Sequence, residues 1–209
     1  MITFTVVAIL GALLVAVLMQ LFKKPNTPAA PVEDLANLQA SDARIGDAIS
    51  VSGAGDDMSD LQFTAESCTW VESGPRRWFE LSGPYKARHV TLRVDASGDE
   101  LEAAVHVDPR KLTLEDLGLS EDDLAQMDER QNTADSFDFD GKVWLYLLSR
   151  EAQATRNNLP QPRGFYYWEF RERNGRGLLA VRKDQDEPFA VALYQSVAPD
   201  DVTVYRGKG

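Results

Sequence analysis

Cysteine and histidine are scarce in this chain of 209 residues, which has one cysteine, Cys68, and two histidines, His89 and His106. One cysteine forms no intrachain disulfide, and so few cysteines cannot build a cysteine-rich zinc site. The histidines are far from Cys68 in sequence, so the sequence alone pairs neither of them with it as a nucleophile and base. Because free cysteines are usually buried, we expect Cys68 to be a packing residue.

Basic residues are also few: 22 Lys and Arg stand against 33 Asp and Glu, which gives a formal net charge of -11. Nucleic-acid binding needs clustered basic side chains, whereas the arginines here alternate with acids or aromatics. We therefore expect no nucleic-acid partner. The chain also lacks the Gly-x-Ser-x-Gly, P-loop and dinucleotide-binding motifs, so no catalytic residue and no cofactor is predicted, and binding is favoured over catalysis.

One long apolar segment lies at the amino end. Residues 2–22, from Ile2 to Phe22, have only three polar side chains, and a helix of this length spans about 31 Å, which matches a bilayer core. A cleaved signal peptide is the alternative, but nothing basic precedes Ile2 and the apolar segment is too long. Lys23 and Lys24 follow, and the positive-inside rule places them in the cytoplasm. We predict a single-pass inner-membrane protein, anchored by residues 1–24, whose carboxyl-terminal domain is cytoplasmic.

A proline-rich tether with a short helix is expected at residues 25–41, and beyond it the apolar spacing changes from helical to alternating. Glycine, proline and aspartate turns separate short alternating segments, which predict strands at residues 45–51, 63–71, 76–81, 90–94 and 101–107. An acidic helical connector is expected at residues 111–133, where capping-box patterns begin at Thr113 and Ser120. Gly118 should divide this connector into two helical pieces.

The second half begins with the strongest hairpin signal in the chain, an Asp140-Gly141 turn between the apolar parts of residues 136–148. Asp135, Asp138 and Asp140 resemble calcium ligands, but no glutamate stands where an EF-hand requires its twelfth ligand. A hairpin turn explains these aspartates better, and no metal site is predicted. Further strands are expected at residues 165–170, 178–181 and 189–193.

The two halves share a pattern. Residues 78–81 and 167–170 both have the order aromatic, aromatic, glutamate, apolar, and each is followed by a turn, an apolar strand and an alternating strand. We interpret this as an internal duplication, with a first β repeat at residues 42–110 and a second at residues 134–209. The predicted fold is therefore mainly β (α+β): an N-terminal transmembrane helix followed by a duplicated β-rich domain with an acidic helical insert.

The repeated glutamates and the aromatic rings beside them are the candidate ligand-binding residues: Glu80, Glu169, Trp78, Tyr167 and Trp168. In a strand, each glutamate shares a face with the ring two residues before it. A carboxylate in such surroundings acts as a general acid or base, or as a polar anchor for a small ligand. The alternative is cross-strand pairing with an arginine such as Arg93 or Arg176, which is an ordinary way to stabilise a sheet.

Three features together resemble a known family: residues 45–47 before the first strand, the two aromatic-glutamate strands, and residues 178–181 leading to the segment 197–205. Over residues 42–206 the chain resembles a bacterial domain family of unknown function. Its members occur in one or two copies and are often encoded near phage-shock-type membrane-stress proteins and polyamine aminopropyltransferases. The resemblance implies a β-rich domain with a role in envelope stress or membrane maintenance, and it implies no catalytic residue.

Two functions are consistent with these features. The first is a membrane-anchored cytoplasmic interaction module, since an anchor and a stiff tether concentrate the domain near partners held at the membrane. Its expected partners are the membrane, through the N-terminal helix, and a membrane-associated protein. The alternative is a small-molecule binding protein or enzyme that holds a cationic metabolite in a groove between the repeats, with Glu80 or Glu169 as its polar group.

Overall fold

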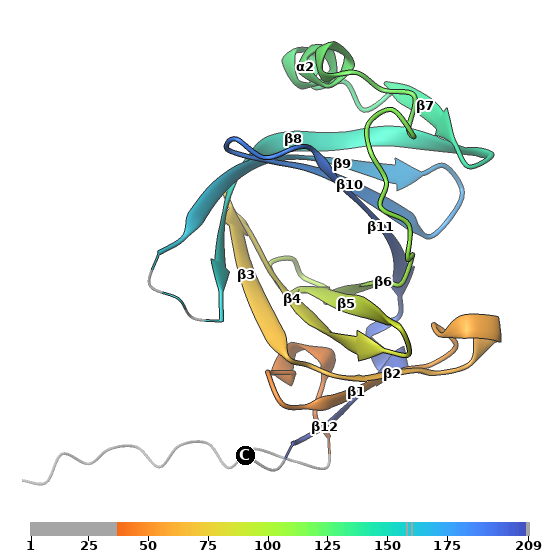
Figure 1. Ribbon diagram of the computed structural model, residues 1–209, viewed down its shortest axis with the longest axis vertical. Helices are drawn as coiled ribbons and strands as arrows, with labels where there is room; N and C mark the ends of the chain where they lie inside the picture. Colours follow the sequence, from red (N-terminus) through yellow and green to blue (C-terminus); the bar gives the residue numbers. More distant parts are fainter. Residues whose placement is uncertain (1–36, 158, 160, 208–209) are drawn as a thin grey trace, which may run out of the picture. The chain divides into compact units, whose positions relative to one another are not determined.

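The computed structural model describes residues 37–157, 159 and 161–207, and most of their strands form a closed antiparallel barrel. Within this part of the chain the barrel has eight strands: β3 (Ser67–Ser73), β4 (Arg76–Tyr85), β5 (Arg88–Asp95), β6 (Glu102–His106), β8 (Lys142–Arg156), β9 (Arg163–Glu172), β10 (Gly177–Asp184) and β11 (Ala190–Val197). Their order around the barrel is β3-β4-β5-β6-β11-β10-β9-β8 (Figure 1). The barrel closes where β8 pairs with β3, for example Ala154 with Val71.

The barrel consists of two consecutive meanders, β3–β6 and β8–β11. They join at two seams, where β6 pairs with β11 and β3 pairs with β8. Glu80 lies on the second strand of the first meander and Glu169 on the second strand of the other. The internal duplication itself stays a prediction of the sequence.

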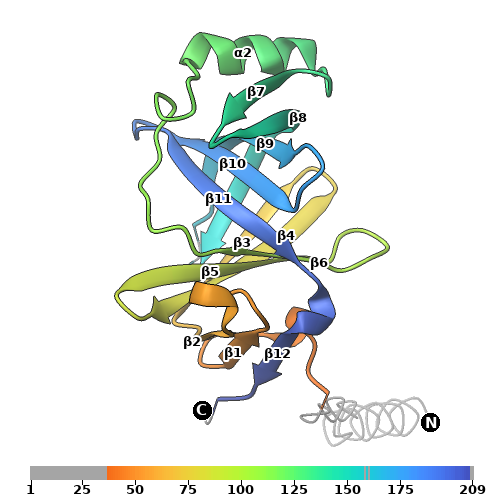
Figure 2. The same cartoon turned by 90° about the vertical axis from the view of Figure 1, so that its right-hand side faces the viewer.

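A small sheet lies against the outer face of β4, β5 and β6 (Figure 2). Its strands are β1 (Ala48–Val51), β2 (Leu61–Thr64) and β12 (Val202–Tyr205), in the order β12-β1-β2, and short 3-10 helices flank them at Ala40–Asp42, Asp56–Met58 and Pro199–Asp201. The small sheet approaches β4 very closely, because a Cβ on Gly83 of β4 would lie 1.9 Å from the carbonyl oxygen of Thr64 in β2. Only glycine fits there without moving β2.

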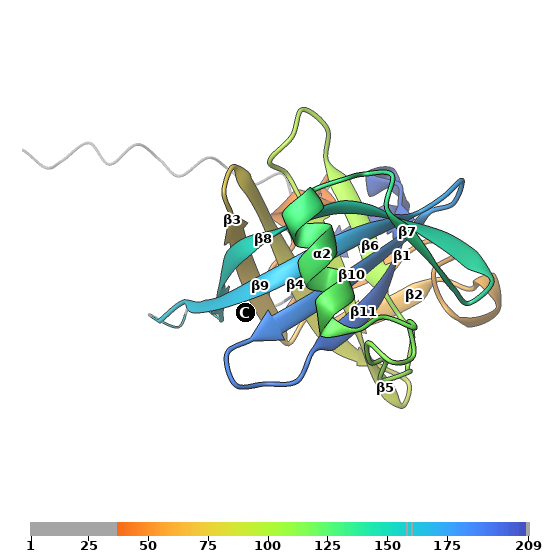
Figure 3. The ribbon, with the colours of Figure 1, turned by 90° about the horizontal axis from the view of Figure 1, so that it is seen from above.

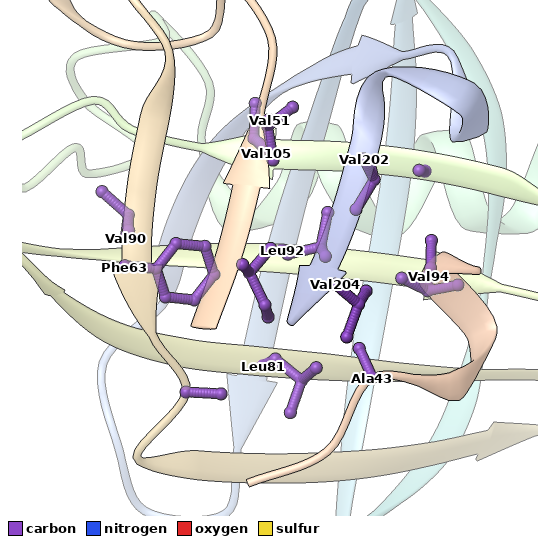
Figure 4. Close-up of a cluster of buried hydrophobic side chains, with 14 of the residues drawn as sticks. Ala43, Val51, Phe63, Leu81, Val90, Leu92, Val94, Val105, Val202 and Val204 are labelled. Carbon is purple, nitrogen blue, oxygen red and sulfur yellow. The ribbon is translucent and has the colours of Figure 1, made fainter. Parts of the chain in front are cut away.

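The first apolar core fills the space between the small sheet and the outer wall of the barrel (Figure 4). Alternate residues of β5 supply Val90, Leu92 and Val94, which pack against side chains such as Val202 and Val204 of β12. Cys68 belongs to this core, where burial, and to a lesser extent the charge of Glu80, raises the pKa of its thiol to about 11. The cysteine is thus a buried packing residue, as the sequence predicts.

The second apolar core lies on the opposite outer face, beneath α2 (Glu121–Arg130) and β7 (Ser136–Phe139). The helix crosses β9 and β10 (Figure 3), and Leu124 and Met127 point into this core. A β-bulge between Tyr146 and Leu148 reverses the faces of β8: Tyr146 points toward this core, whereas Leu148 points into the barrel.

The expectation of a mainly β domain is confirmed, with local differences. The hairpin turn at Asp140-Gly141 is present, and both residues have the positive φ that such a turn needs. The capping box at Ser120 is also present, but α2 covers only part of the expected helical connector. Residues 114–118 form turns instead, and Gly118 ends them at a φ of 68°. Expected strand 63–71 is two strands, because the chain leaves the small sheet for the barrel at Ala65 and Glu66.

In the described ranges, no helix combines the length and the apolar character that a membrane span needs. The predicted anchor, from Ile2 to Phe22 with Lys23 and Lys24, lies outside the described residues, as does most of the predicted tether. The single-pass topology and the cytoplasmic location therefore stay predictions.

Candidate ligand site inside the barrel

The inside of the barrel differs in character from its two apolar outer faces. Side chains alternate along each strand, so the residues between the outward-pointing ones point inward. One region of the interior is apolar and contains Val71, Trp78, Ala152, Ala154, Phe165 and Tyr167. The other region is charged. Strands β4 and β9 are not neighbours in the barrel, so the contacts between their side chains cross the interior.

Glu169 is at the centre of the charged region and is fully buried, with 0% of its surface exposed. Its Oε2 accepts a hydrogen bond from Nη1 of Arg76 at 2.8 Å, and its Oε1 accepts one from Nη2 of Arg93. Arg76 also donates to Oδ2 of Asp95, from Nη2 at 2.7 Å and from Nε at 3.1 Å. The other oxygen of Asp95 accepts from the backbone and the hydroxyl group of Ser97. These contacts define the interior network: Arg76, Arg93, Asp95 and Glu169.

The members of the interior network keep their charges at neutral pH. Burial alone would raise the pKa of Glu169, but Arg93 and Arg76 lower it further than burial raises it. Burial likewise raises the pKa of Asp95, and the hydrogen bonds from Ser97 and the contact with Arg76 outweigh that effect. Burial lowers the pKa of Arg93, but the charges of nearby glutamates reverse the shift and leave that pKa raised. The network is a set of ion pairs and not a set of neutral groups.

Glu80 lies on the same inner face of the sheet but makes different contacts. Its Oε1 accepts hydrogen bonds from Nε1 of Trp78 at 3.1 Å and from the hydroxyl group of Tyr194 at 3.4 Å. Burial, followed by the charge of Glu80, raises the pKa of Tyr194 well above its usual range. Arg93 is opposite Glu80 in the strand register, yet the carboxylate that it pairs with is Glu169, from the other meander. Its guanidinium carbon lies 4.3 Å from the ring centroid of Trp78, which holds the guanidinium group by a cation–π contact.

A cavity of about 730 Å³ opens beside the interior network. All members of the network line it, together with small or apolar side chains such as Ala104, Leu148 and Leu178. Its rim is formed by the β5–β6 loop, which includes Glu100, and by the β9–β10 turn, which includes Arg176. Pockets for small molecules have volumes of roughly 300–1,000 Å³, so the size suits one such molecule.

The structure brings together four of the five residues that the sequence singles out: Glu80, Glu169, Trp78 and Tyr167. The rings of Trp78 and Tyr167 meet edge to face across the interior, with centroids 5.5 Å apart, and Glu169 lines the cavity itself. Trp168 is elsewhere, because it points outward and its Nε1 donates to the carbonyl oxygen of Leu124 at 3.2 Å beneath α2. Arg176, the other expected partner, lies at the rim.

Sequence reasoning missed Arg76 and Asp95. Both lie at strand ends beside turns, where a charged residue is expected to face water. A signal was nevertheless present in β5, where Arg93 and Asp95 alternate with apolar residues and so share one face. The sequence does not show that this polar face is the inside of a barrel.

Comparison of the chain with protein-family models, with curated proteins and with solved structures gives no match. The resemblance to a bacterial domain family over residues 42–206 therefore stays a prediction, and the site is interpreted from its own geometry.

Proposed function

We propose that this protein binds a small polar molecule in the cavity inside the barrel, beside Arg93 and Glu169. The observation that carries the proposal is where the apolar and charged side chains lie. Both large apolar cores lie outside the barrel, while charged side chains lie inside it beside a cavity of about 730 Å³. An eight-stranded barrel has an interior that is either filled by side chains or wide enough for one small ligand. In this barrel, apolar side chains fill one region of the interior, and the cavity beside the interior network is large enough for one small ligand.

The energetics of the interior network support the same function. Moving charged groups out of water is unfavourable, and replacing a buried ion pair by apolar residues of similar volume is often neutral or stabilising. Apolar side chains would therefore fill this interior at lower cost in free energy than Arg93 and Glu169 do. Charged groups held beside a cavity in spite of that cost are typical of a functional site.

The hypotheses drawn from the sequence are compatible with this proposal. If the halves are repeats, the cavity lies between them, since Arg93 comes from the first and Glu169 from the second. The described residues that line the cavity include four arginines and four carboxylates, so the sign of the charge alone does not select the cationic metabolite. The interaction module at the inner membrane rests on the predicted anchor and on the family resemblance, and it stays a separate prediction.

A ligand screen with a blocked cavity tests the proposal. Ser196 lies exposed at the rim, so Ser196→Trp should place a large ring in the cavity without disturbing either apolar core, and Ser196→Ala is the matched control. The full chain, in detergent micelles because of the predicted anchor, is mixed with amino acids, carboxylates, sugar phosphates and polyamines, and its melting temperature is measured. Compounds that stabilise the native protein and Ser196→Ala should not stabilise Ser196→Trp. The proposal fails if no compound stabilises the native protein, or if the tryptophan variant responds equally.

A further inference from the structure

The carboxylates at the inner wall of the cavity already have hydrogen-bond donors as partners. Each carboxylate oxygen of Glu169 accepts from an arginine of the interior network. In Asp95, one oxygen accepts from Arg76 and the other from Ser97. Neither carboxylate offers an oxygen without a partner to a ligand.

Hydrogen-bond donors at the same wall are in excess. A guanidinium group carries five N–H bonds, and among the described residues Arg93 uses its Nη2 on Glu169 and has no second acceptor. Arg93 is only 4% exposed, and it lines the cavity. Glu80 faces Arg93 from the next strand, but no hydrogen bond or ion pair joins these two side chains in the part of the chain described. In the part of the chain that the structure describes, no nitrogen of Arg93 is among the buried polar atoms that lack a partner, so its unused donors are open to the cavity, from which an acceptor can come.

Resting on the proposed function, we infer that the ligand presents an oxyanion, a carboxylate or a phosphate group, to Arg93. A guanidinium group matches the geometry of such groups and binds them through two parallel hydrogen bonds. The stacking of Arg93 on Trp78 fixes its plane before the ligand arrives, which lowers the entropy lost on binding.

The rim does not decide the charge of the ligand. Arg171 and Arg176 are balanced there by Glu100 and Glu102, and all four are exposed to solvent. Interactions of exposed charges are weakened by water and by salt. The unused donors of the buried residue Arg93 therefore determine which ligand group binds.

Three compounds with the same five-carbon chain test this inference: glutarate has two carboxylates, glutaramide two neutral amides and cadaverine two ammonium groups. Binding is followed on nitrogen-15-labelled full-length chain through the indole N–H signals of its tryptophans. Trp78 lies against Arg93 and donates to Glu80 at 3.1 Å, so a ligand on Arg93 should shift its signal. Trp144 and Trp168 donate to backbone carbonyls on the outer face and are internal controls.

Glutarate should shift the Trp78 signal saturably and leave the control signals unchanged. Glutaramide should need about ten times the concentration, because hydrogen bonds to an ionised acceptor are roughly twice as strong as neutral ones. Cadaverine should leave the signal in place. Arg93→Lys keeps the positive charge beside Glu169 but removes the bidentate N–H donors of the guanidinium group. This substitution should therefore weaken glutarate binding about tenfold. The same substitution at exposed Arg77, outside the cavity, should have no effect.

The inference is overturned if cadaverine shifts Trp78 at lower concentration than glutarate, or if Arg93→Lys binds glutarate as the native protein does. If the signals of Trp144 and Trp168 are the same in Arg93→Lys as in the native protein, that variant keeps its fold. If glutarate leaves Trp78 unshifted while another compound binds in the screen and is excluded by Ser196→Trp, the oxyanion is wrong and the proposed function stands. If no compound binds in either experiment, both the inference and the proposed function are wrong.

Discussion

Replacing Glu169 by glutamine isolates the contribution of the interior network to stability. The carboxylate is 0% exposed and pairs with two arginines. Glutamine keeps the shape but not the charge, so it leaves Arg93 buried without a carboxylate partner among the described residues, whereas Arg76 keeps Asp95. Removing one partner of a buried ion pair typically costs about 3–5 kcal/mol. Because Arg76 keeps its second partner, we expect the lower end of this range, about 3 kcal/mol.

Urea unfolding of the full chain, followed by tryptophan fluorescence, measures this loss, and Glu72→Gln is its matched control. Glu72 also pairs with one arginine, Arg77, at 3.0 Å, but its side chain is 61% exposed. Exposed pairs contribute about 0–1 kcal/mol, so the control should lie within that range. Equal losses for the two variants would refute the conclusion that the interior network is buried and ionised.

A double variant separates the lost ion pair from lost packing. Replacing Arg93 and Glu169 together by methionine removes both charges and keeps most of the volume. Apolar replacement of a buried pair is often neutral or stabilising, so the double variant should recover most of the stability that Glu169→Gln loses. A double variant as unstable as the single one would mean that shape, and not charge, causes the loss.

Two further outcomes are expected. Gly83→Ala should lower the free energy of unfolding by about 1–3 kcal/mol, because its Cβ would overlap the carbonyl oxygen of Thr64, whereas Gly164→Ala, with nothing within 4 Å of the added atom, should not. Acid should destabilise the native protein more steeply than Glu169→Gln. Burial raises the pKa of Glu169, but its arginine partners leave it below the ordinary value of 4.5, so its stabilisation is complete above pH 4.5 and is lost as the pH falls through the lower native-state pKa. Parallel acid titrations of the two proteins would contradict this assignment.

Local chemistry is the part of the fold that the sequence predicts well. The turn at Asp140-Gly141 and the cap at Ser120 form as expected, because a few neighbouring residues decide each of them. Alternation likewise locates most strands. The prediction is wrong where a strand has few apolar residues. The expected strand ends at residue 148, but β8 continues to Arg156, with Ala152 and Ala154 pointing inward and polar side chains outward.

That continuation of β8 has a consequence for the site. Residues 153–156 pair with β3 and close the barrel, so a segment with few apolar residues forms the pairing that creates an interior. Before closure, each sheet has one apolar face and one polar face, and a polar face is expected to meet water. In the closed barrel the face that carries the charged residues points inward, and the small sheet and α2 cover the more apolar faces from outside. The alternation of apolar and polar residues is the same in an open sheet and in a closed barrel. Only the pairing between residues far apart in the sequence distinguishes the two.

The candidate site could be predicted in part for the same reason. Glu80 and Glu169 are recognisable from their repeated aromatic surroundings, and Arg93 is recognisable as an arginine on a polar strand face. Which carboxylate Arg93 meets depends on closure: in an open sheet its partner would be Glu80, directly opposite it, whereas in the barrel it reaches Glu169 across the interior. The residue that strand pairing alone would assign to a surface ion pair thus becomes a buried donor beside a cavity. The chemistry of the site is therefore a property of the barrel as a whole and not of either half.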